Sequence, residues 1–280
     1  MTATRLTTRR VEKPWGRHAL WPGFPDPADD AEPIGEVWFE DPRGGDLDLL
    51  VKYLFTAEKL SVQVHPDDRM ARSMGQKRGK DEAWIVLAAE PGATIGIGLR
   101  RVLTSDELRT AALDGSIEHL LDWRAVAPGD VYYSPSGTIH AIGAGVTLIE
   151  IQQNSDTTFR LYDYGRPREL HIEDSIVAAD PVPYVASNVA RDIDEGRTLL
   201  ADGPAFVLER WTGAHEAALP AMGPVWFVPV AGSGRIDDEP LSPGGTWLAE
   251  DGATLSLAQD SDILIAYTGA APMTLPSTRT

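Results

Sequence analysis

Short runs of β-branched and aromatic residues recur along the chain, and glycine or proline separates them at close intervals. Such runs, bounded by turn-forming residues, are typical of β-strands. The pattern predicts strands at residues 36–39, 49–55, 59–64, 82–87, 93–97, 131–134, 147–152, 206–211, 225–230, 245–248 and 262–267.

Helical periodicity is much rarer than strand periodicity in this chain. It is clearest at residues 104–123, where Thr104 and Glu107 have the spacing of a capping box and an apolar stripe follows. Gly115 is expected to split this helix, and a shorter helix is predicted at residues 67–74. The predicted fold class is therefore mostly β, a sandwich, jelly roll or barrel with a few short helices.

A domain boundary is predicted within residues 180–195, where prolines, small residues and charges follow one another without periodicity. This boundary divides the chain into two β domains, residues 1–180 and 190–280. All five lysines and five of the six histidines precede it, and only His215 follows it. We therefore expect the chemistry in the first domain and a structural or lid role for the second.

The charge balance narrows the classes of partner. Lys and Arg number 25 against 42 Asp and Glu, which gives a formal net charge of −17. Because phosphates and anionic headgroups repel such a chain, neither nucleic acid nor membrane is an expected partner. The sequence has no run of about 18 apolar residues and no apolar core of a signal peptide near its first residue, so a cytoplasmic protein is predicted.

The absence of cysteine excludes several chemistries at once. With no cysteine in the chain, disulfides, thiolate nucleophiles and cysteine-based metal sites are all impossible. Any bound metal must have imidazole, carboxylate or amide ligands.

Three segments carry residues suited to such a metal. Gln63 and His65 are two apart in a predicted strand and so face the same way, as do Lys80 and Glu82 at the start of another. His140 follows a Pro- and Gly-rich turn. Taken singly, each is equally consistent with a solvated face, a surface ion pair or a core histidine. Together Gln63, His65, Glu82 and His140 form a nitrogen and oxygen donor set that zinc accepts.

A fourth segment, residues 147–170, is rich in functional groups. Glu150 and Gln152 share one face of a predicted strand. Asp156, Arg160, Asp163, Arg166 and Arg168 follow in the next turn. These residues are consistent with a solvated loop, but in so acidic a chain the arginines are also the obvious local site for a phosphate, which arginine binds through two parallel hydrogen bonds.

Four motifs, in this order and at these intervals, closely resemble a known family: SVQVHPDD, KDEAWIVL, SPSGTIHAIGAG and EIQQNSDTTFRLYDYGR. The family is the type I phosphomannose isomerases, zinc-dependent enzymes of the cupin class, in a short form. The resemblance covers roughly residues 10 to 175. It implies a cupin-type double-stranded β-helix for residues 1–180, a degenerate cupin-like domain for residues 190–280, and a small sugar phosphate as partner.

The resemblance also implies roles for individual residues. Gln63, His65, Glu82 and His140 match the ligands of one zinc ion per chain. Arg160 matches the arginine placed over the reacting carbons, and Lys80, Glu150 and Asp156 match other catalytic or pocket residues. Ser61 and Arg166 match positions that contact the substrate phosphate, although the longer enzymes have a lysine in place of Arg166.

The implied reaction interconverts mannose 6-phosphate and fructose 6-phosphate through an enediol. Lys80, Glu150 and a zinc-bound water are all competent as its base. Three alternatives stay open at this point: a related sugar isomerase of different specificity, a metal-dependent cupin oxygenase, and a sugar-binding cupin without catalysis. The oxygenases usually prefer iron with an open facial triad, which the additional ligand Gln63 disfavours.

Overall fold

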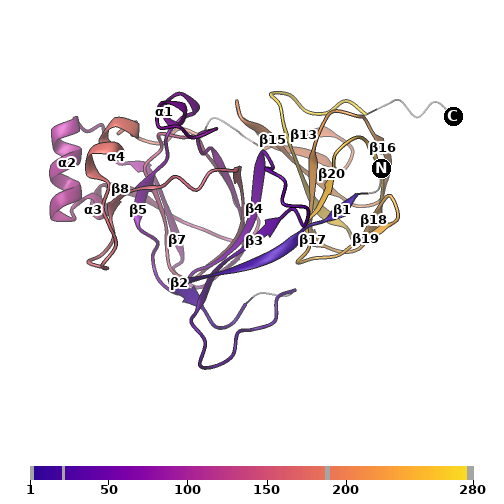
Figure 1. Ribbon diagram of the computed structural model, residues 1–280, viewed down its shortest axis with the longest axis horizontal. Coiled ribbons are helices and arrows are strands. Elements are labelled where there is room, and N and C mark those ends of the chain that lie inside the picture. Colours follow the sequence, from indigo (N-terminus) through magenta and orange to yellow (C-terminus); the bar gives the residue numbers. More distant parts are fainter. Residues whose placement is uncertain (1–2, 21–22, 187–189, 276–280) are drawn as a thin grey trace.

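The computed structural model describes residues 3–20, 23–186 and 190–275, and these residues form four antiparallel sheets in two pairs. Figure 1 shows the pair built from the earlier part of the chain on the left and the pair built from the later part on the right. The mostly-β prediction is therefore confirmed. Within the described residues, no helix is long and apolar enough to span a bilayer.

The first pair of sheets holds the predicted functional residues. Its six-stranded sheet has the order β2 (Thr7–Arg17), β3 (Ile34–Glu40), β4 (Leu49–Phe55), β11 (Val146–Gln153), β6 (Glu82–Ala89) and β9 (Val131–Ser134). Its five-stranded sheet has the order β12 (Phe159–Tyr162), β5 (Val62–Val64), β10 (His140–Ile142), β7 (Thr94–Leu99) and β8 (Leu121–Ala125). Trp84, Leu148 and Ile95 pack between the two sheets.

The second pair of sheets has a core of its own. The seven-stranded sheet has the order β1 (Thr4–Arg5), β20 (Trp247–Ala249), β17 (Val225–Ala231), β22 (Asp262–Thr268), β15 (Phe206–Thr212), β14 (Arg197–Asp202) and β13 (Arg191–Asp194). The four-stranded sheet has the order β16 (His215–Leu219), β21 (Ala253–Leu257), β18 (Gly234–Ile236) and β19 (Glu239–Leu241). Buried Trp211, Phe227 and Trp247 belong to this core.

The two pairs are joined by a third core. Phe39 and Tyr53 of the six-stranded sheet belong to one buried cluster with Phe206 and Trp226 of the seven-stranded sheet. Because β1 pairs with β20, the beginning of the described chain also belongs to the later sheet. The division into domains at residues 180–195 stays a prediction, and residues 187–189 of that segment lie outside the described residues.

The helices pack on the five-stranded sheet; in Figure 1, α2, α3 and α4 lie at the left and α1 at the top. They are α1 (Asp68–Ser73), α2 (Ser105–Asp114), α3 (Ile117–Leu120) and α4 (Ile172–Ala178). Thr104 and Glu107 form the predicted capping box, and Gly115, at φ 80°, ends α2. The predicted helix 104–123 is too long, because residues from Leu121 onward pair with β7 as β8. Helix α4 is not in the sequence prediction.

Candidate functional site

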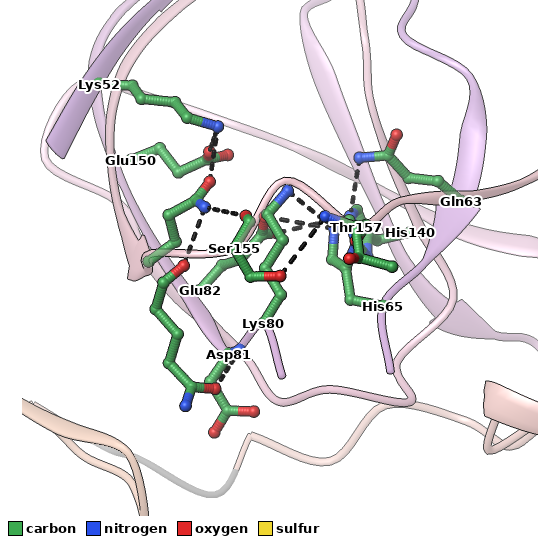
Figure 2. Close-up of polar contacts among 12 residues, drawn as sticks. Lys52, Gln63, His65, Lys80, Asp81, Glu82, His140, Glu150, Ser155 and Thr157 are labelled. Atoms are coloured by element: carbon green, nitrogen blue, oxygen red, sulfur yellow. Dashed lines mark hydrogen bonds and ion pairs between the residues drawn. The ribbon is translucent and has the colours of Figure 1, made fainter. Parts of the chain in front are cut away.

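The centre of the candidate site is formed by three buried residues at strand ends. His65 follows β5, while Glu82 and His140 begin β6 and β10. Strands β5 and β10 are neighbours in the five-stranded sheet, and β6 belongs to the facing six-stranded sheet. One ligand atom from each of the three side chains lies within 4.8 Å of the others. Figure 2 shows these three residues together.

Both histidines present an unprotonated nitrogen to Glu82. His65 Nδ1 lies 3.0 Å from the Thr157 carbonyl oxygen and His140 Nδ1 lies 2.9 Å from that of Thr138. Because a carbonyl only accepts, each Nδ1 carries the proton and each Nε2 keeps its lone pair. These Nε2 atoms lie 3.2 and 3.5 Å from the Glu82 carboxylate oxygens.

Burial keeps both rings neutral. It lowers the pKa of His65 to about 4, assisted by the positive charge of Lys80, and it lowers the pKa of His140 in the same way. Neutral imidazoles whose second nitrogen is held by a carbonyl are the form in which histidine binds metal ions.

Glu82 has the properties of an anionic metal ligand. It is 1% exposed, and neither carboxylate oxygen accepts a hydrogen bond from the residues that the structure describes. Lys80 Nζ lies 2.9 Å from Oε1 as an ion-pair partner. Burial raises the pKa of Glu82, but Lys80 and then His65 outweigh burial and hold it well below its usual range. A buried carboxylate with unused lone pairs beside two neutral imidazoles fits a metal ion that takes nitrogen and oxygen ligands.

Gln63 lies at the same centre with its amide nitrogen inward. Its Nε2 is 3.1 Å from His140 Nε2, and its Oε1 is 3.2 Å from the Ser61 hydroxyl oxygen. A 180° rotation of the amide exchanges the two atoms and presents an oxygen to the cluster. Its role as a fourth ligand stays a prediction.

A pocket of about 340 Å³ opens beside the cluster. Of the residues predicted for the site, those that line it are Ser61, Gln63, Lys80, Glu150, Asp156 and Arg160. The pocket wall is therefore dominated by charged and polar side chains, the kind of surface that binds a polar small molecule.

Arg166 is absent from the residues that line this pocket. Its guanidinium is bound to Asp163 at 3.1 Å and to Glu58 at 3.0 Å. Arg168 lines the pocket instead, with its Nε 2.6 Å from the same Asp163. The predicted contact of Arg166 with a phosphate stays a prediction.

Lys52 is a pocket residue that the sequence prediction missed. Its Nζ lies 3.1 Å from Glu150 Oε1, 2.6 Å from Gln152 Oε1 and 4.5 Å from the centre of the Trp38 ring. Burial lowers the pKa of Lys52, but Glu150 and Glu36 outweigh burial and raise it, so the amine stays charged. The available signal was a lysine within the apolar strand LLVKYLF, since a charge at a core position is rarely accidental.

Strands β2 and β3 supply more of the pocket wall. Arg9, Lys13 and Glu36 line it, and Lys13 Nζ lies 3.3 Å from Glu36. The alternation of Arg9, Val11, Lys13 and Trp15 along β2 was the signal for this face, since residues two apart in a strand point the same way.

Sequence comparisons show which known proteins this chain resembles. A mannose-6-phosphate isomerase of Streptococcus mutans is 40% identical over 197 residues, which cover 67% of this chain and 62% of the relative. Mannose-6-phosphate isomerase ManA of Bacillus subtilis is 36% identical over 220 residues, which cover 72% and 70% of the two chains. No family model matches the chain.

A solved structure extends the comparison to the fold. The crystal structure of the mannose 6-phosphate isomerase from Bacillus subtilis superposes with a TM-score of 0.83 at 28% identity, covering 95% of this chain and all of that one. The fold is that of the cupin class, with a candidate metal site between the sheets of its first pair. The chain belongs to the mannose-6-phosphate isomerase family.

Proposed function

We propose that this protein interconverts mannose 6-phosphate and fructose 6-phosphate, with one zinc ion held by His65, Glu82, His140 and Gln63. The observation that carries the proposal is the buried His65, Glu82 and His140 cluster beside a charged pocket, in a chain of this family. The proposal assigns catalysis to residues 1–180.

The reaction moves a proton between C1 and C2 of the sugar through an enediol. Zinc, when bound, supplies Lewis-acid polarisation of the substrate oxygens. Arg160 lines the pocket, and its Nε has no hydrogen-bond partner among the described residues. In our proposal its guanidinium stabilises the negative charge that develops on the enediolate oxygen.

The proton itself requires a group within reach of C1 and C2. Lys80 and Glu150 both line the pocket, and they are the two side chains that the proposal offers as acid or base. Glu150 is held by Lys52 and by Trp84 Nε1, which donates to it at 3.2 Å, so its carboxylate has a defined orientation. Asp156 contributes a further carboxylate to the pocket wall.

Ser61 and Arg166 are proposed to bind the phosphate, with Arg168 a further candidate because it lines the pocket. The Ser61 side chain lies beside Gln63, so a phosphate on Ser61 sits close to the metal cluster. Arg166 contributes only if it exchanges its contact with Glu58 for one with the substrate.

The deciding experiment measures conversion of mannose 6-phosphate to fructose 6-phosphate by the purified protein, after chelation and after zinc is restored. The proposal expects turnover that disappears with the chelator and returns with zinc. Absence of turnover with zinc bound contradicts the substrate assignment. Turnover that survives complete removal of metal contradicts the zinc site.

A further inference from the structure

Asp81 lies between Lys80 and Glu82 but faces away from them, as Figure 2 shows. The side chain is buried, and its carboxylate accepts a hydrogen bond from the Tyr133 hydroxyl at 2.5 Å and one from the Ser136 backbone N–H at 2.8 Å. The backbone N–H of Asp81 donates to Gln153 Oε1 at 3.0 Å. Asp81 therefore joins three segments of the first pair of sheets.

Two of these segments lead directly to residues of the candidate metal site. Glu82 is the next residue after Asp81, and Ser136 belongs to the turn that precedes His140. The Asp81 carboxylate thus fixes the start of β6 relative to this turn. A shift of that carboxylate moves Glu82 and His140 relative to each other.

Tyr133 connects the Asp81 carboxylate to the second pair of sheets. Its ring is 3% exposed and packs against Phe206 of β15, with 5.7 Å between the ring centres. Tyr133 lies even closer to Gly203, in the turn between β14 and β15. A Cβ added to Gly203 would lie 1.9 Å from the Tyr133 hydroxyl oxygen. Only glycine at position 203 leaves room for this tyrosine.

The hydroxyl is a donor to Asp81 at every pH at which the protein would be assayed. Burial raises the pKa of Tyr133, and the neighbouring Asp81 carboxylate raises it further. A protonated hydroxyl facing a carboxylate makes a short, charge-assisted hydrogen bond.

We propose that Tyr133 is a positioning residue through which the later pair of sheets sets the geometry of the metal site. This inference rests on the proposed function for the identity of the metal. Phe206 and Gly203 hold Tyr133, Tyr133 holds Asp81, and Asp81 holds Glu82 and the turn before His140. Residues beyond 190 then act on the site without touching it.

The first test is Tyr133→Phe, which removes the hydroxyl and keeps the ring. We expect zinc affinity, measured by competition with a chromophoric chelator, to fall about 10- to 100-fold, the usual effect of losing a group that orients a metal ligand. At saturating zinc, kcat falls while KM stays constant, because the sugar pocket is not lined by Tyr133. The visible spectrum of the cobalt-loaded protein also changes.

The matched control is Tyr132→Phe. Tyr132 precedes Tyr133 in β9 and so faces the opposite side of the sheet, where it packs with the core between the first two sheets. We expect this variant to keep wild-type zinc affinity and the wild-type cobalt spectrum.

A second variant acts from the other pair of sheets. Gly203→Ala places a methyl group where the Tyr133 hydroxyl lies and so displaces the ring. We expect the same direction of change in zinc affinity and in the cobalt spectrum as for Tyr133→Phe, in a chain whose metal-free form still unfolds cooperatively.

The outcomes separate this inference from the proposed function. If Tyr133→Phe and Gly203→Ala both keep the wild-type zinc affinity and cobalt spectrum, the positioning role is overturned, whatever the wild-type enzyme catalyses. If both variants bind zinc more weakly, the positioning role is supported. If the wild-type protein in the same experiments does not isomerise mannose 6-phosphate, only the proposed substrate is contradicted. If Tyr132→Phe loses as much zinc affinity as Tyr133→Phe, the positioning role is also overturned, because the effect is then not specific to the Tyr133 hydroxyl.

Discussion

Two glutamates, one in each pair of sheets, are almost completely buried, and they differ in their contacts. Glu209, 0% exposed, accepts hydrogen bonds from Trp211 Nε1 at 2.8 Å, from Arg197 Nη2 at 2.8 Å and from the Tyr267 hydroxyl. Glu82, 1% exposed, accepts none from the described residues and has an ion pair with Lys80.

This is the difference expected between a structural carboxylate and one that binds a ligand. A buried polar group without hydrogen bonds costs free energy of folding. Such a group is therefore expected where a bound ligand supplies the missing interactions. Glu209, in β15, has its hydrogen-bond donors within the protein. They come from β14, from β22 and from the backbone N–H of Met273. Glu82 has carboxylate oxygens without hydrogen bonds from the described residues, as our proposal of a metal ligand requires.

The largest expected effect comes from Glu82→Gln. We expect kcat/KM to fall more than about 1,000-fold, which is about 4 kcal/mol, because the anionic ligand of the metal is lost. The free energy of unfolding of the metal-free protein changes little, because the lost ion pair with buried Lys80 is offset by removal of a buried carboxylate that accepts no hydrogen bond from the described residues. Kinetic assays and urea titrations check the two parts, and retained activity with bound zinc would falsify the assignment of Glu82.

Glu209→Gln should show the reverse pattern. Removing this charge leaves Arg197 buried without its ion-pair partner, so we expect the free energy of unfolding to fall by roughly 3 kcal/mol. Zinc affinity should stay at the wild-type value. Urea unfolding measures the first quantity and chelator competition the second, and an unchanged midpoint contradicts the structural role of Glu209.

The same contrast applies to two arginines of the pocket. Arg160 Nε has no hydrogen-bond partner within the described ranges, whereas Arg168 donates to Asp163 through Nε at 2.6 Å and Nη2 at 2.7 Å. We expect Arg160→Ala to lower kcat about 100-fold or more and Arg168→Ala to act mainly on KM. Steady-state kinetics at saturating zinc compares them, and equal kcat values would remove the distinction.

The smallest effect is the pH dependence of the metal-free protein. The folded pKa of His65 is about 4, below its usual 6.5, so between these values the unfolded chain binds a proton that the folded chain does not. Stability therefore falls as the pH falls, by roughly 1 to 2 kcal/mol between pH 6.5 and 5 for His65 alone, and the lowered pKa of His140 acts in the same direction. Urea titrations at both pH values measure this loss. A slope that His65→Gln leaves unchanged contradicts the prediction.

The strand pattern predicted the centres of the sheets better than their edges. Strands β4, β11 and β6 are mostly apolar because they are central strands of the six-stranded sheet, and their charged residues Lys52, Glu150 and Glu82 belong to the candidate site and its pocket. Strand β2, over Thr7–Arg17, was missed because it lies at the edge of that sheet, is largely exposed and contains a proline and a glycine.

The sequence predicted the part of the candidate site whose residues lie at the ends of strands. His65, Glu82 and His140 come together because strand pairing brings those ends to one place, and their types alone indicate a metal. The difference between Arg166 and Arg168 was not predictable, since it depends on which side chains meet Asp163. That arrangement is a property of the folded loop and leaves no periodicity in the sequence.

The pairing of β1 with β20 has a consequence for synthesis on the ribosome. Arg5 pairs with Trp247, so the first strand leaves the ribosome long before its partner exists. At roughly 5–20 residues per second, the delay is on the order of 10–50 s. During that time β1 has no partner strand, and the seven-stranded sheet can be completed only after β22, its last strand in the sequence, has been synthesised.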